Sequence, residues 1–195
     1  MLSILSPETF KTIPWKNGLG HTTELAISDG GTLDNFNWRL SIASVVNDGD
    51  FSNFAGYQRN LVLIEGEGLI LDHRNGDVDN LTKLLDIAHF DGGYKTNGKL
   101  VNGGIKDFNI MTKQQSFTAQ VDTYTNSTNV ALTANNNVLI FAYSLSGDLT
   151  LEQDKKTTQV AKGALAKYEQ QAVNNESNIS ISGENMILIQ LSKSQ

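Results

Sequence analysis

Residues 61–71 read Leu-Val-Leu-Ile-Glu-Gly-Glu-Gly-Leu-Ile-Leu, two short apolar runs separated by a turn that carries glycine and glutamate. Apolar runs of this length, bounded by turn residues, are typical of β-strands. We therefore predict a hairpin with its turn at Gly66 and Gly68. Glu65 and Glu67 flank the glycines, and a solvated turn accounts for them better than an acid/base pair does.

The same order of features returns in the last third of the chain. Val138–Tyr143 leads through a glycine turn into Leu149–Leu151. Further on in each half, Ile87–Phe90 and Leu165–Tyr168 hold an alanine two residues before an aromatic residue. This repeat predicts two similar β units fused in one chain. Short strands divided by Gly, Asn and Asp turns favour an all-β protein of jelly-roll type with little helix.

Composition excludes several classes of function. The 195 residues are 39% hydrophobic and 18% charged, which is enough to build a core. A net charge of −6 argues against nucleic acid, which requires a basic face. The chain has no cysteine, so disulfides and thiolate chemistry are excluded. Without a signal sequence or an apolar run of about 20 residues, we expect a cytoplasmic protein that does not bind membranes.

The stretch Pro14–Glu24 combines a proline, a tryptophan, two glycines, a lysine, an asparagine and a glutamate. Lys16 and Asn17 fall in a glycine-flanked loop, where Asn17 could donate to a ligand and Lys16 could supply charge. The alternative is that Asn17 braces the turn through its own backbone. Beyond the loop, alternation places Thr22 and Glu24 on one face of a strand.

Two arginines are the best candidates for holding a carboxylate, because a guanidinium presents paired donors to its two oxygens. In Trp38–Ala43 the alternation places Arg39 and Ser41 on the face opposite Trp38. Arg59 comes two residues before the apolar run that begins at Leu61. The alternative for Arg39 is a structural ion pair with Glu24, since a buried charge needs a partner. The two interpretations are compatible.

Alternation in Ile105–Met111 places Asp107 and Asn109 on one strand face, opposite Phe108 and Ile110. An acid and an amide on one face suit recognition of a group with both donors and acceptors. A hydrogen-bonded brace between the two halves of the chain explains them equally well.

Five blocks of the chain together resemble the HutD/Ves family of bacteria, in order and spacing, over roughly residues 8–115. The blocks are Pro14–Gly18, Phe36–Ala43, Asp48–Phe54, Gly56–Arg59 and Asp107–Thr112. The resemblance implies a bicupin, that is, two fused cupin-like jelly-roll units, which agrees with the repeat. We accordingly expect an N-terminal unit over residues 1–104, a C-terminal unit over residues 105–195, and one compact body.

The resemblance also implies a function. Some family members are linked to histidine utilisation genes, and there the protein resembles an accessory or regulatory binder of a small pathway metabolite. Urocanate, formylglutamate or formate-like carboxylates are the implied ligands. No catalytic activity is attached to the family.

Many cupins bind a metal ion through a His-x-His pair, a glutamate and a further histidine. The three histidines here, His21, His73 and His89, are isolated in sequence. We expect no metal and no other cofactor. The alternative is that His21 and His89 converge with Glu24 in space.

We therefore predict a non-catalytic protein that binds a small carboxylate in a polar pocket of its N-terminal half. The predicted lining is Lys16, Asn17, Glu24, Arg39, Ser41, Arg59, Asp107 and Asn109. Exposed sheet edges would allow two copies to pair as a homodimer. A metal-free isomerase or hydrolase is the alternative, with Glu24 or Asp107 as base and Arg39 as electrostatic stabiliser. A third reading, a protein-interaction module, applies if side chains fill the pocket.

Overall fold

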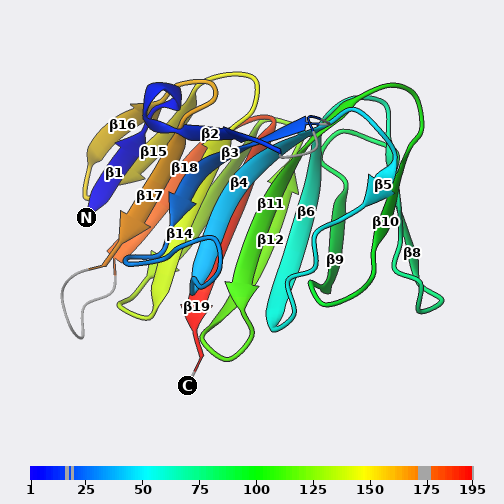
Figure 1. Ribbon diagram of the computed structural model, residues 1–195. Coiled ribbons are helices and arrows are strands. Elements are labelled where there is room, and N and C mark those ends of the chain that lie inside the picture. The colour runs from blue at the N-terminus through cyan, green and yellow to red at the C-terminus, as the bar shows by residue number, and fades with distance from the viewer. Residues whose placement is uncertain (16–17, 19, 171–176, 195) are drawn as a thin grey trace. The chain divides into compact units, whose positions relative to one another are not determined.

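The computed structural model describes residues 1–15, 18, 20–170 and 177–194. Nineteen strands make up almost all of the regular structure, and the only helical turn in these ranges is the 3₁₀ turn η1 (Pro7–Thr9) (Figure 1). The prediction of an all-β protein with little helix is confirmed. The chain divides into two compact units, Phe10–Phe117 and a second unit made of Met1–Thr9 with Thr118–Gln195.

The unit Phe10–Phe117 contains two antiparallel sheets. The six-stranded sheet has the order β2 (Lys11–Pro14), β3 (Gly20–Ile27), β4 (Trp38–Val45), β11 (Ile105–Lys113), β6 (Tyr57–Glu65) and β9 (Ile87–Asp91). The four-stranded sheet has the order β5 (Gly49–Asp50), β10 (Asn97–Leu100), β7 (Leu69–Asp72) and β8 (Val78–Leu81). Both sheets contribute to one buried apolar cluster, which includes Leu61 and Leu63 from one sheet and Leu69 and Leu71 from the other.

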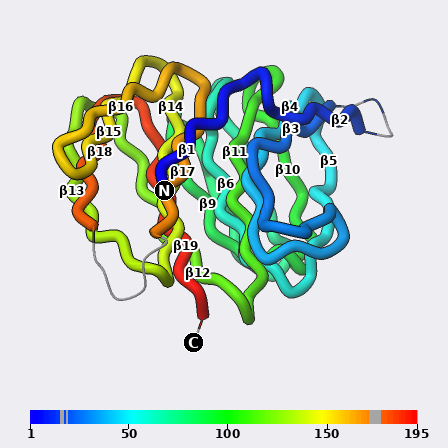
Figure 2. The backbone as a smooth tube through the Cα atoms, turned by 90° about the vertical axis from the view of Figure 1, so that its left-hand side faces the viewer, coloured from blue at the N-terminus to red at the C-terminus, as the bar shows by residue number. Residues whose placement is uncertain are grey.

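The second unit has the same construction. Its five-stranded sheet has the order β1 (Leu2–Leu5), β17 (Leu165–Glu169), β14 (Val138–Ser144), β19 (Met186–Lys193) and β12 (Phe117–Tyr124). Its four-stranded sheet has the order β13 (Thr128–Ala134), β18 (Ser177–Gly183), β15 (Leu149–Gln153) and β16 (Lys156–Val160). Figure 2 shows the N-terminal strand β1 beside β17, with which it pairs.

Strand order establishes the internal repeat. The neighbours β4-β11-β6-β9 and β5-β10-β7-β8 of the first unit recur as β12-β19-β14-β17 and β13-β18-β15-β16 in the second. The part that the two units share is therefore an eight-stranded jelly roll, and the predicted pair of cupin-like units is confirmed. Strand β11 closes the first repeat by pairing with β4 and β6. For that reason the division between the units lies after Phe117, whereas the sequence placed it between residues 104 and 105.

The predicted hairpin over residues 61–71 is wrong. Strand β6 pairs with β11 and β9, and β7 pairs with β10 and β8, so neither has a free edge for the other. Glu65–Gly68 is instead the connection by which the chain leaves one sheet and enters the next. Strands β14 and β15 are related in the same way in the second unit.

The glycine-rich segment Asp91–Gly104 contains the strand β10. In this strand Gly98 pairs with Gly49 of β5 and Leu71 of β7. A Cβ atom at Gly98 would lie 2.4 Å from Cε2 of Phe51, far inside van der Waals contact. The missing side chain therefore makes room for the Phe51 ring.

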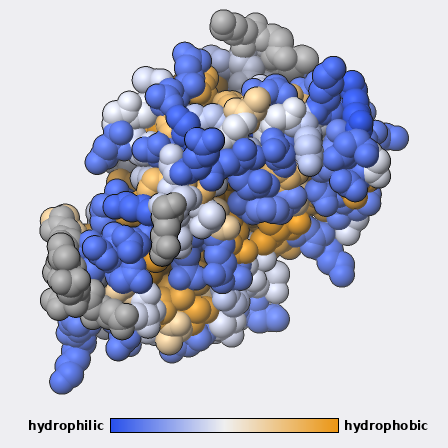
Figure 3. Space-filling view, turned by 90° about the horizontal axis from the view of Figure 1, so that it is seen from below, coloured by the Kyte–Doolittle hydropathy of each residue, from blue (hydrophilic) through white to orange (hydrophobic). Residues whose placement is uncertain are grey.

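No helix among the described residues is long and apolar enough to cross a membrane. On the face in Figure 3, hydrophilic residues cover most of the surface and leave smaller apolar areas between them. Large apolar side chains lie mainly in the cores, with 0% exposure at Leu40, Leu61 and Phe108. This distribution follows from the alternating strand patterns.

The Gly98→Ala variant should destabilise the unit Phe10–Phe117 by about 1–3 kcal/mol, because the added methyl group overpacks the space that Phe51 fills. Urea unfolding followed by tryptophan fluorescence measures this, since both tryptophans, Trp15 and Trp38, belong to this unit. The matched control is Gly49→Ala on the paired strand, where a Cβ would meet nothing within 4 Å. Equal urea midpoints for the two variants would contradict the packing argument.

Candidate functional site

Cross-strand register places the two candidate arginines in one row. Arg39 of β4 pairs with Met111 of β11, and Met111 pairs with Arg59 of β6. Neighbouring strands lie about 4.8 Å apart, so the two arginine Cα atoms lie about 10 Å apart. In the adjacent row on the same face, Ser41 pairs with Asn109. Strands β4 and β11 lie side by side (Figure 1), and their alternation places these polar residues on one face of the sheet.

A cavity of about 610 Å³ opens on this face of the first unit. Its polar side includes Arg39, Ser41, Arg59 and Asn109, and its other walls include aromatic and aliphatic side chains. The apolar lining includes Ile13, Trp15, Leu33, Phe51, Phe54 and Met111. Cavities of this volume, with a few convergent polar groups in apolar walls, are typical of small-molecule sites.

Arg39 forms the ion pair that the sequence suggested. Its Nε donates to Oε2 of Glu24 over 2.7 Å, and the Arg39 side chain is 6% exposed. A bulge in β3 after Glu24 shifts the register against β4. Among the described residues, Glu24 is the one hydrogen-bond partner of the Arg39 guanidinium, and Arg39 also lines the cavity. The structural pair and donors for a ligand therefore coexist.

Arg59 is buried in an aromatic cage. Its guanidinium carbon lies 5.4, 5.8 and 5.2 Å from the ring centres of Phe51, Phe54 and Phe90. Nη2 donates to Oδ1 of Asn109 over 2.5 Å, and Nη1 lies 3.5 Å from the carbonyl oxygen of Ser52. Burial lowers the pKa of Arg59 to about 10, an effect that the charge of Asp107 opposes. The guanidinium therefore stays charged at neutral pH.

Asp107 lies behind Asn109 and does not line the cavity. It is 0% exposed, and its Oδ1 accepts a short hydrogen bond from Nδ2 of Asn109. Its Oδ2 is buried without a hydrogen-bond partner in the part of the chain that the structure describes. Burial raises the pKa of Asp107 to about 7, against the opposing effects of Arg59 and of the bond from Asn109. Asp107 is thus poised between its charged and neutral forms.

The predicted site residues fall into three groups. Arg39, Ser41, Arg59 and Asn109 line the cavity, whereas Glu24 and Asp107 contact lining residues from behind. Lys16 and Asn17 lie outside the described residues. Sequence reasoning missed most of the apolar lining, although the alternation that placed Asn109 also places Met111 on the same face. The missed residues include Trp15, Phe51, Phe54 and Met111.

The histidines do not converge. His21 lies in β3 and His89 in β9, with β4, β11 and β6 between them in the sheet. At about 4.8 Å per strand this is roughly 19 Å. Over the described ranges there is no cluster of three or more His, Cys, Asp or Glu residues arranged to hold a metal ion.

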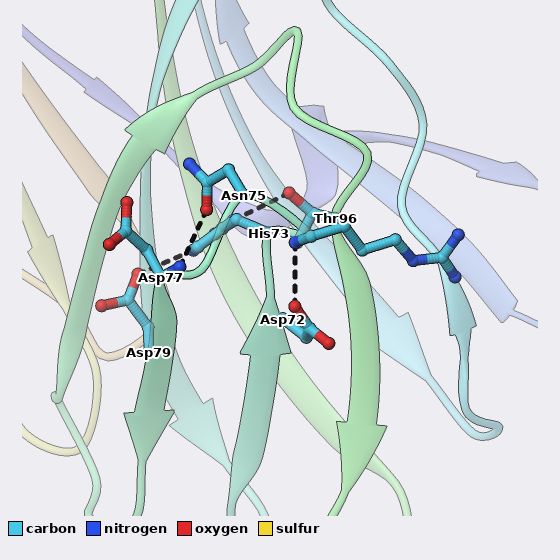
Figure 4. Close-up of polar contacts among 7 residues, drawn as sticks. Asp72, His73, Asn75, Asp77, Asp79 and Thr96 are labelled. Atoms are coloured by element: carbon cyan, nitrogen blue, oxygen red, sulfur yellow. Dashed lines mark hydrogen bonds and ion pairs between the residues drawn. The ribbon is translucent and has the colours of Figure 1, made fainter.

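His73 joins neighbouring segments of the first unit through polar contacts of its ring (Figure 4). Its Nδ1 lies 2.9 Å from Oγ1 of Thr96, and its Nε2 lies 3.0 Å from Oδ2 of Asp79. These contacts join the turn after β7 to β8 and to the segment before β10. The ring of His73 also packs against that of Phe90, with 4.7 Å between their centres. His73 therefore supports one wall of the cage around Arg59.

Comparison with known proteins identifies the family to which this chain belongs. A family model described as HutD matches residues 7–189. An uncharacterized 21.2 kDa protein of Pseudomonas putida, from the hutC 3' region, is 36% identical over 145 residues, 73% of this chain and 74% of that protein. Protein Ves of Escherichia fergusonii is 37% identical over 108 residues, 55% of this chain and 56% of Ves.

Two solved structures support the fold. HutD from Pseudomonas fluorescens SBW25, solved in a formate condition, has a TM-score of 0.86 and 26% identity, with 100% of both chains covered. A cupin 2 conserved barrel domain protein from Leptotrichia buccalis has a TM-score of 0.55 and 12% identity, with 93% of this chain and 92% of that chain covered. The second likeness concerns the fold alone.

The Asp107→Asn variant should become more stable relative to the wild-type chain as pH rises from 4 to 7. Unfolding lowers the pKa of Asp107 from about 7 to its ordinary value of about 3.9. At pH values between these two pKa values, Asp107 has lost its proton in the unfolded chain and kept it in the folded chain. The free energy of unfolding of the wild-type chain therefore falls as pH rises. Three pKa units correspond to about 4 kcal/mol.

Urea unfolding at several pH values, followed by tryptophan fluorescence, measures this difference. A matched control is Asp77→Asn, which changes an exposed carboxylate of the same unit. A constant difference between Asp107→Asn and the wild-type chain from pH 4 to pH 7 would show that Asp107 ionises normally.

Proposed function

This chain belongs to the HutD family, and we propose that it binds a small carboxylate metabolite in the cavity of the unit Phe10–Phe117. The bound carboxylate would lie between the guanidinium groups of Arg39 and Arg59. The role of this binding is regulatory or accessory, within histidine utilisation.

The observation that carries the proposal is the pair of buried arginines facing one cavity. Both residues are 5% exposed, and both retain N–H groups without partners among the described side chains. A carboxylate satisfies such donors in the paired geometry that a guanidinium favours. Its binding strengthens where water is excluded, because the effective dielectric constant is low.

The rest of the cavity suits the carbon skeleton of a metabolite. Trp15, Leu33 and Phe54 supply apolar contact, while Ser41 and Asn109 supply polar groups. Urocanate, formylglutamate and formate all carry a carboxylate that could occupy the arginine pair. The P. putida relative from the hutC 3' region and the formate condition of the P. fluorescens HutD structure support this choice of ligands.

The enzyme alternative has less support from the geometry. Its two candidate bases, Glu24 and Asp107, are not among the residues that line the cavity. Oε2 of Glu24 is held by Arg39, and Asp107 is covered by Asn109. A module that only binds proteins would not require an open cavity of about 610 Å³. Small-molecule binding therefore accounts for more of the observed arrangement.

Calorimetric titration with urocanate, formylglutamate and formate tests the proposal. We expect saturable binding of at least one of the three, with one site per chain. If none of them binds, the proposed function is wrong as stated. If a bound ligand is converted to a product, the enzyme alternative takes its place.

Arginine-to-lysine substitutions provide a matched set, since they keep the charge and remove the forked donor geometry. We expect Arg39→Lys and Arg59→Lys each to weaken binding of the titrated ligand by about tenfold or more. Arg74→Lys is the control, because Arg74 is exposed and pairs with Asp50 at the surface. Loss of affinity in all three variants alike would argue against a specific role for the two buried arginines.

A further inference from the structure

Four ionisable side chains lie together behind and along the polar side of the cavity. They are Glu24, Arg39, Arg59 and Asp107, two acids and two bases. With both carboxyl groups ionised, the formal charges of these four side chains sum to zero. With Asp107 protonated the sum is +1, which one bound carboxylate neutralises. Asp48 and Asp50 also line the cavity, where Asp48 accepts from the backbone N–H of Leu100 and Asp50 pairs with Arg74.

Asp107 also sets the position of Arg59 through Asn109. The Asn109 amide donates through Nδ2 to Asp107 and accepts through Oδ1 from Arg59. Rotating the amide would place an oxygen against the carboxyl group and an amino group against the guanidinium. Both bonds would then be lost, so the carboxyl group of Asp107 fixes the orientation of the amide and, through it, one side of the guanidinium.

The surroundings of Asp107 contain few other charges. Its cross-strand partners are Ala43 of β4 and Leu63 of β6. The facing sheet contributes Leu69 and Leu71 to the same apolar cluster.

The charged groups around Asp107 come from the neighbouring strands and from the cavity lining. From the neighbouring strands they are Arg39, its partner Glu24, and Arg59. In the cavity lining, Asp48 accepts from the backbone N–H of Leu100, and Asp50 pairs with Arg74. The charge on Asp107 therefore depends mainly on Arg59 and on whatever occupies the cavity.

We propose that Asp107 is a positioning residue that holds Arg59 through Asn109 and takes up one proton when an anionic carboxylate binds. This inference rests on the proposed function. The incoming carboxylate shares the positive charge of Arg59, so the attraction that keeps Asp107 ionised weakens. A proton from solvent then binds the carboxyl group, whose Oδ2 has no hydrogen-bond partner among the described atoms. Charge balances, since one anion and one proton enter together.

The dependence of Kd on pH measures the proton uptake, because the slope of log Kd against pH counts the protons that accompany binding. Formate and N-formylglutamate are suitable probes, since carboxyl groups with pKa near 4 stay ionised from pH 6 to pH 9. We expect wild-type affinity to fall by up to about tenfold for each pH unit above neutral. A flat profile for a probe that binds would overturn the inference alone. If neither probe binds at any pH, the proposed function and the inference fail together.

Three variants separate positioning from a general structural role. Asp107→Asn keeps the acceptor and is always neutral, so its Kd should stay at the wild-type low-pH value across the range. Asp107→Ala removes the acceptor and should weaken binding about tenfold at every pH. The control Asp77→Asn should keep the wild-type slope. A wild-type slope in Asp107→Asn would show that another group takes up the proton.

Discussion

A guanidinium buried in an apolar unit is the constraint on which this structure depends. Leaving the charge of Arg59 without compensation would cost several kcal/mol. Three phenylalanine rings, the Asn109 amide and the Ser52 carbonyl supply that compensation in part. The ring of Phe51 can pack there because Gly98 has no side chain. Arg59 also lines the cavity, where the proposed anionic ligand would complete the compensation.

The repeat explains the fold but does not extend to the site. On strands β14 and β19, which correspond to β6 and β11, the inward positions are apolar, including Ile140, Ala142, Met186 and Leu188. In the second unit this face therefore packs into the core, whereas in the first unit it carries arginine, asparagine and aspartate. The cavity of about 610 Å³ lies in the unit whose strands carry these polar side chains.

Strand alternation predicted much of the site. It placed Arg39 and Ser41 on one face of their strand, and Asp107 and Asn109 on one face of theirs, as the structure has them. It could not tell that Asn109 opens to the cavity while Asp107 lies behind it, since that depends on the register and on the facing sheet. The hairpin at residues 61–71 was misassigned because an apolar run does not reveal which strand will pair with it.

The central claim is that the two buried arginines hold a carboxylate, and NMR of the arginine side-chain N–H groups tests it most directly. The chain has only three arginines, so Arg39, Arg59 and Arg74 can be resolved in one spectrum. During titration with formate, we predict that the Arg39 and Arg59 signals shift and saturate with one shared Kd, while the Arg74 signal stays in place. Unchanged Arg39 and Arg59 signals, or a shift confined to Arg74, would contradict the account.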